Sequence, residues 1–183
     1  RPSMGEIKST LDLVMEKTKN LSLSSEERQA QKNQEIESRI RGLLQKFKDQ
    51  VLKVDNLKAE YQKLQKDYDL SGNAPLIKEI CGQIELGTDN HAWLELLARL
   101  KVADRKRVTS VLHEFDEVID AAAHEQYKIL LDKLAKVHFI SGSAVVPNLE
   151  ADKDWQEKAR EVRAKFEPLL DQAKTKLLGA HFS

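Results

Sequence analysis

The sequence contains few of the residues that build turns and sheets. Its 183 residues include only 7 glycines and 4 prolines, and 5% are aromatic. A chain of short strands needs frequent turn residues and many aromatic or β-branched positions. We therefore expect an all-α protein.

Cysteine occurs once, at Cys81, which excludes an intramolecular disulfide and a CxxC metal or redox pair. Ile77 and Ile84 flank it at helical spacing, so we expect Cys81 to pack in the core as a small hydrophobic residue rather than to act as a nucleophile. Gly-rich phosphate loops are also missing from the sequence. These features favour a non-enzymatic protein without a cofactor in a reducing cytoplasm.

Long apolar runs and an excess of charge are both missing. No stretch approaches the 18 or so consecutive apolar residues of a membrane-spanning helix, and the first residues lack the form of a signal peptide. Lys plus Arg and Asp plus Glu are equal at 30 each, so no overall field attracts nucleic acid or an anionic membrane. We expect a cytoplasmic protein, bacterial by its simple organisation, that binds no membrane.

Helical periodicity dominates the first half of the chain. An amphipathic helix is predicted over 4–23, with Ile7, Leu11, Val14 and Leu21 on its apolar face. Ser24 and Glu27 form a capping box, which predicts that a second helix begins there. Apolar positions then recur to residue 68 without a break, so one continuous helix of about 65–70 Å is expected over 25–70. Its first turns, "EERQAQKNQE", are polar on all sides.

The second half has clearer boundaries. Pro75, Gly87 and either Asp89 or Asn90 delimit two short helices, near 75–86 and 91–101. A long helix is expected from an Asp104 cap to Gly142, and a last one over 152–178 from an Asp152 cap. Pro168 predicts a kink or a restart in that last helix.

These elements predict an elongated antiparallel helical bundle. Its coiled-coil-like shaft would pair the helix near 25–70 with the helix near 105–140, and the 152–178 helix would be the third member. The two short helices would cap one end. We expect an N-terminal amphipathic arm over 4–23 and a single bundle domain over 24–183.

The stretch "HEFDEVIDAAAHE" raises the question of a metal or acid–base site. At 100° per residue His113, Glu117, Asp120 and His124 share one stripe, which points away from the predicted core. The two histidines are about 16 Å apart along the helix, too far for one ion, and neither HExxH nor Glu-x-x-His is present. A solvated helix face is the favoured interpretation; a partner contact and a metal or proton-handling role are the alternatives.

A basic cluster is the only strong departure from mixed charge. It comprises Arg99, Lys101, Arg105, Lys106 and Arg107. It could bind a phosphate backbone or an acidic partner, but no aromatic residue is interleaved and no helix-turn-helix surrounds it. A solvated turn is the simpler interpretation, and nucleic acid is not the expected partner.

Three classes of function follow from these patterns. The leading one is a helical interaction or scaffolding protein that binds a protein partner, or a second copy, through helical faces. We expect Ile7, Leu11, Val14 and Leu21 to make intermolecular contacts, with dimerisation ahead of partner capture. The alternative is nucleic-acid or phosphate binding through the basic cluster at 99–107. The third is a metal protein or enzyme that uses the His113–His124 stripe.

Overall fold

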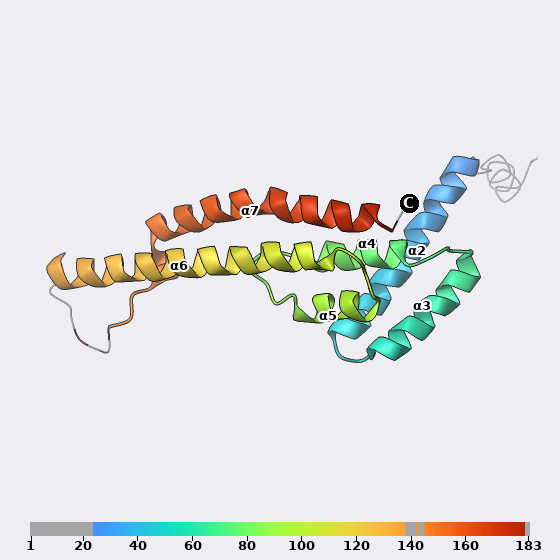
Figure 1. The fold of residues 1–183 in the computed structure, drawn as a ribbon, viewed down its shortest axis with the longest axis horizontal. Helices are drawn as coiled ribbons and strands as arrows, with labels where there is room; N and C mark the ends of the chain where they lie inside the picture. Colours follow the sequence, from blue (N-terminus) through green and yellow to red (C-terminus); the bar gives the residue numbers. More distant parts are fainter. Residues whose placement is uncertain (1–23, 138–141, 143–144, 182–183) are drawn as a thin grey trace, which may run out of the picture. The chain divides into compact units, whose positions relative to one another are not determined.

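A computed structural model describes residues 24–137, 142 and 145–181. Every secondary-structure element within these residues is helical, which confirms the expected all-α class (Figure 1). The chain divides into two compact units, Arg1–Arg39 and Ile40–Ser183, and α2 contributes residues to both. Among the described helices, none has the length and apolar character needed to cross a membrane.

The predicted capping box begins α2 (Ser25–Lys48). The Glu27 backbone N–H donates to Ser24 Oγ at 3.1 Å, and the Ser24 backbone N–H donates to Glu27 Oε2 at 2.7 Å. Residues 26–35 are all exposed, as their polar character predicts, and burial begins at Ile36. The first turns of α2 therefore depend on capping and local pairs rather than on packing.

The continuous helix predicted over 25–70 is wrong. The chain breaks after α2, and five residues separate it from α3 (Val54–Tyr68). Gln50 adopts a φ of 58°, and the Val51 and Leu52 backbone N–H groups both donate to the Lys46 carbonyl at 2.9 and 3.1 Å. Val51, one of the apolar positions that recur through the predicted 25–70 helix, is 74% exposed. The break allows more apolar surface to be buried. A straight helix of this length would extend beyond the core, whereas the separate α3 buries an apolar face (Leu57, Tyr61 and Leu64).

The two short helices are confirmed as α4 (Ala74–Gln83) and α5 (His91–Arg99). Pro75 lies in the first turn of α4, where its missing N–H leaves no hydrogen bond unmade. The buried carboxylate of Glu79 on α4 accepts from Arg41 Nε of α2 at 2.8 Å. The second half of α2 is thereby tied to α4 within the larger unit.

The longest helices are α6 (Arg105–Val137) and α7 (Lys153–Gly179), which run antiparallel as a hairpin (Figure 1). Phe115 and Phe166 meet edge to face between them, with ring centroids 5.7 Å apart. The predicted shaft of 25–70 against 105–140 is therefore wrong, since the main pairing joins α6 to the last helix. The reason is the break after Lys48, which removes the long first member.

Caps and breaks in the hairpin follow the predictions in part. Asp152 Oδ2 accepts the Trp155 backbone N–H at 2.9 Å and so caps α7, after the short 3-10 helix η1 (Leu149–Ala151). Pro168 was expected to cause a kink or a restart; it lies inside an uninterrupted α7, so the helix does not restart there. Asp104 precedes α6 with a φ of 60° instead of the extended conformation typical of an N-cap. Gly142 was expected to end this helix, but it follows residues 138–141, which lie outside the described part.

Candidate functional site

The structure divides the predicted basic cluster into two groups. Arg99 ends α5, and with Lys101 it lines a cleft of about 260 Å³. Arg105 turns back and donates from Nη1 to the Val102 carbonyl at 3.0 Å. Lys106 and Arg107 are exposed on the first turn of α6 and do not line this cleft. The five cations of the sequence therefore do not form one surface.

A third cation, Lys58 of α3, also lines the cleft, although it lies 41 residues before Arg99 in the sequence. Its Nζ donates to the Arg99 carbonyl at 3.1 Å, at the carboxyl end of α5 where carbonyl groups lack helical partners. Sequence reasoning missed Lys58, because nothing local distinguishes it from the other lysines of an exposed helix. Only the packing of α3 brings it to the end of α5.

The floor of this cleft is ordered by hydrogen bonds to the chain before α4. Tyr61 Oη and Gln65 Nε2 both donate to the Gly72 carbonyl, at 3.2 and 2.6 Å. Burial raises the pKa of Tyr61, so its hydroxyl keeps its proton and its donor role. No carboxylate is among the residues that line the cleft: Lys58, Tyr61, Gln62, Gln65, Asn73, Leu76, Arg99, Leu100 and Lys101.

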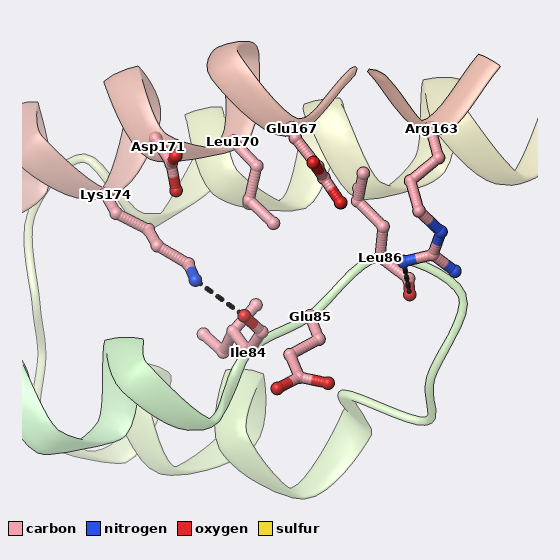
Figure 2. A pocket seen from close by; sticks show the side chains of 8 residues that line it. All are labelled: Ile84, Glu85, Leu86, Arg163, Glu167, Leu170, Asp171 and Lys174. Atoms are coloured by element: carbon pink, nitrogen blue, oxygen red, sulfur yellow. Dashed lines mark hydrogen bonds between the residues drawn. The ribbon is translucent and has the colours of Figure 1, made fainter. Parts of the chain in front are cut away.

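A second cleft, of about 320 Å³, lies between α7 and the loop that follows α4 (Figure 2). Two cations of α7 hold the loop: Lys174 Nζ donates to the Ile84 carbonyl at 2.6 Å, and Arg163 Nη1 to the Leu86 carbonyl at 3.2 Å. The Arg163 guanidinium also stacks over the Phe115 ring, 5.9 Å from its centroid. Both cations are thus engaged with the protein itself.

Asn90 fixes the same loop from inside. Its side chain is buried, accepts the Glu85 backbone N–H at 3.1 Å, and donates to the carbonyls of Glu85 and Thr88 at 2.7 and 3.1 Å. Gly87 completes the turn with a φ of 69°, where an added Cβ would lie 3.1 Å from Arg163 Nη2. The Asn90 bonds hold the loop in shape, and the Lys174 and Arg163 bonds join it to α7. We call this arrangement the latch.

Three carboxylates border the latch, on Glu85, Glu167 and Asp171. They do not converge: the Glu85 carboxylate is directed away from α7, which carries the other two (Figure 2). Among the residues that the structure describes, no group of three or more His, Cys, Asp or Glu side chains is placed to hold a metal ion.

The His113–His124 stripe lies on an exposed face of α6, as its spacing predicts. His113, Glu117, Asp120 and His124 are all exposed, and His113 Nε2 is 3.4 Å from Glu117 Oε1 in a one-turn pair. An exposed pair of this kind contributes little to stability. The stripe has the geometry of a solvated helix surface.

Cys81 lies in the core, which confirms its predicted position. It is 3% exposed, and burial raises the pKa of its thiol to about 11, with a smaller opposing effect of nearby Lys174. The thiolate required for nucleophilic or metal chemistry is therefore disfavoured at neutral pH.

Apolar side chains remain exposed on one side of the hairpin. Val118 and Ile129 of α6 are 41% and 51% exposed, and Leu169 of α7 is 41% exposed. Half-buried Val111 belongs to the same stripe, because it lies within about 20° of Val118 and Ile129 around the helix. We call these four residues the open face.

The open face lies on the opposite side of the hairpin from the latch. Val118 and Leu169 are each turned by about 120° around their helices from Leu112 and Arg163, the residues on the latch side. The N-terminal apolar stripe of Ile7, Leu11, Val14 and Leu21, the predicted partner contact, falls outside the described residues.

Comparison with protein-family models, with curated protein sequences and with solved structures gives no match to this chain.

Proposed function

We propose that the chain is a non-enzymatic helical association protein that pairs with a second copy through the open face. The exposure of Val118, Ile129 and Leu169 carries this proposal, because large apolar side chains gathered on one face of a two-helix hairpin favour association. Beyond Phe115, α6 continues to Val137 without one fully buried side chain. A second hairpin would supply the missing cover.

Charge at the rims of the open face favours a second copy as the occupant. The α6 rim carries acidic side chains (Glu114, Glu125 and Asp132), and the α7 rim carries lysines (Lys158, Lys165 and Lys176). Each group lies about 20–60° outside the apolar stripe of its helix. The α6 rim also carries Arg107 and Lys136, and Lys136 pairs with Asp132 at 2.8 Å; the α7 rim also carries Asp154 in its first turn. The α6 rim is therefore acidic and the α7 rim basic in net charge only. Such a surface complements itself when two copies are related by a suitable two-fold axis.

An axis parallel to the helices satisfies this condition. It places α6 of one copy against α7 of the other and keeps residues at the same height, which makes an antiparallel four-helix bundle. Heights are set by the contact of Phe115 with Phe166. Glu125 then lies about 15 Å and Lys158 about 12 Å from that contact in the same direction, within reach across the interface. A two-fold axis perpendicular to the helices would instead place the acidic rim of one copy against the acidic rim of the other, which is unfavourable.

The expected affinity is modest. Val118, Ile129 and Leu169 each have about half of their surface still to bury, equivalent to about 1 kcal/mol apiece. Three such side chains in each copy give about 6 kcal/mol, against an association cost of at least about 4 kcal/mol. The pairing should therefore depend on protein concentration.

Sedimentation velocity over a range of concentrations tests the proposal. The variant Val118→Glu with Leu169→Glu should stay monomeric at every concentration, because it places charge in the apolar centre of the interface. The control His113→Glu with His124→Glu adds the same charge on another face of α6, and it should pair like the parent. A parent chain that stays monomeric throughout would contradict the proposal.

A variant that begins at Ser24 tests whether the N-terminal segment, rather than a second copy's open face, makes the contact. The open-face proposal predicts that it pairs as well as the full chain. If the pair is lost on deletion, Ile7, Leu11, Val14 and Leu21 provide the contact instead. If pairing becomes stronger, the N-terminal segment covers the open face in its own chain. Either change would overturn the proposal as stated.

A further inference from the structure

The cleft between α3, α4 and the end of α5 concentrates positive charge. Three of its nine lining residues are cations, Lys58, Arg99 and Lys101, and none is a carboxylate. The whole chain has equal numbers of acidic and basic residues, so this arrangement departs from the average surface. A cleft of this composition attracts anions, and its low-dielectric walls strengthen the attraction.

Lys58 is held in the cleft by a hydrogen bond, and Arg99 has most of its donors available. Lys58 is half-buried, and its bond to the Arg99 carbonyl uses one of its three N–H donors. The Arg99 side chain has one neighbouring acid, Glu95, at 3.6 Å on the exposed side of α5. That long contact leaves most of the five guanidinium donors available.

The backbone conformation of Lys101 fixes where its side chain leaves the chain. Lys101 has a φ of 55°, the left-handed conformation that usually favours glycine after a helix, and its N–H donates to the Ala98 carbonyl at 3.0 Å. A lysine is therefore held at a position where a side chain is disfavoured. The side chain lines the cleft with Arg99 and Lys58.

Neutral groups supply the rest of the lining. The amides of Gln62 and Asn73 add hydrogen-bond donors and acceptors, while Leu76 and Leu100 provide an apolar wall. Small-molecule sites combine these features: a few convergent polar groups that fix orientation and an apolar surface for the remainder of the ligand.

We propose that this cleft binds the phosphate group of a small phosphorylated compound. Ammonium and guanidinium groups make short, charge-assisted hydrogen bonds to phosphate oxygens, and three of them would match a dianionic phosphomonoester. A volume of about 260 Å³ suits a small ligand. A nucleic-acid backbone is disfavoured, because Arg105 bonds to the Val102 carbonyl and the exposed Lys106 and Arg107 are not among the residues that line the cleft.

Isothermal titration calorimetry with inorganic phosphate and with phenyl phosphate, at low salt, tests the proposal. The variant Lys58→Gln with Lys101→Gln should lose affinity by about tenfold or more, because it removes two charge-assisted contacts. Gln at position 58 retains an N–H donor for the Arg99 carbonyl. The control Lys106→Gln with Arg107→Gln makes the same change in net charge outside the cleft, and its affinity should change by less than about twofold. Circular dichroism verifies that both variants are folded.

Three outcomes would overturn this inference. The first is the absence of saturable binding of either probe to the parent chain. The second is an equal loss of affinity in the two variants, which would assign the binding to general electrostatics. The third is tighter binding of a single-stranded oligonucleotide that depends on Lys106 and Arg107. None of these outcomes bears on self-association, which uses a different surface.

Discussion

Replacing Asn90 tests the hydrogen bonds that hold the 85–90 loop in its conformation against α7. Asn90→Ala removes four hydrogen bonds: Oδ1 accepts from the Glu85 N–H and from Thr88 Oγ1, and Nδ2 donates to the carbonyls of Glu85 and Thr88. A typical intramolecular hydrogen bond contributes about 1 kcal/mol net, and this side chain is buried. We therefore expect the free energy of unfolding to fall by about 2–4 kcal/mol, a large share of the stability of one domain.

Urea denaturation, followed by circular dichroism and tryptophan fluorescence, measures this loss. Trp93 is buried on α5, three residues after Asn90, so its fluorescence reports the local packing. Asn90→Asp has nearly the same shape and keeps the acceptor for the Glu85 N–H, but it places a carboxylate oxygen against two carbonyls. It should destabilise at least as much as alanine at pH 7. A loss below about 0.5 kcal/mol in both variants would refute the assigned hydrogen bonds, because surface substitutions fall in that range.

Two further predictions concern Cys81 and Asp152. The pKa of the Cys81 thiol is raised to about 11, so the native protein should react with iodoacetamide at pH 8 far more slowly than the urea-unfolded protein; equal rates would contradict the burial. Because the folded pKa lies above the ordinary value of 9.0, this thiol should also reduce stability as pH rises from about 9 to about 11, and Cys81→Ala should remove that part of the pH dependence. Asp152→Ala loses the cap on the Trp155 N–H and the bond from Gln126 Nε2, at 2.9 and 2.8 Å, so thermal and urea unfolding should show a loss of about 1–3 kcal/mol; Asp152→Asn, which retains an acceptor, should lose less.

Local sequence signals predicted the helix boundaries where a side chain or a proline acts on its own neighbours. The Ser24–Glu27 capping box, Pro75 and the Asp152 cap are such cases, and each begins a helix as expected. These interactions span three residues or fewer, so they do not depend on the rest of the fold.

The break after α2 lacks such a signal. No glycine or proline lies between Lys48 and Val54, and the left-handed residue is Gln50. The apolar period continues across the break, so periodicity alone predicted one helix. Tertiary packing decides this boundary, because α3 can bury Leu57, Tyr61 and Leu64 only by leaving the line of α2.

The candidate site also depends on tertiary packing that local sequence patterns do not reveal. Arg99 and Lys101 are close in sequence and were found as part of a basic cluster, but Lys58 comes from another helix. The separation of Arg105 from that cluster depends on a single bond to the Val102 carbonyl. Charge counts along the sequence therefore identified the region, while its partition into a cleft and an exposed turn required the fold.

Self-association through the open face is tested most directly by cross-linking between two different chains. One chain carries Glu125→Cys and the other Lys158→Cys, both with Cys81→Ala, and the two are mixed under mild oxidation. The parallel two-fold axis predicts that the mixed disulfide forms faster than either homodimer, with twice the 20.9 kDa mass of the chain. A faster homodimer linked through position 125, or no cross-linked product in any combination, would contradict the proposed pairing of α6 with α7 of a second copy.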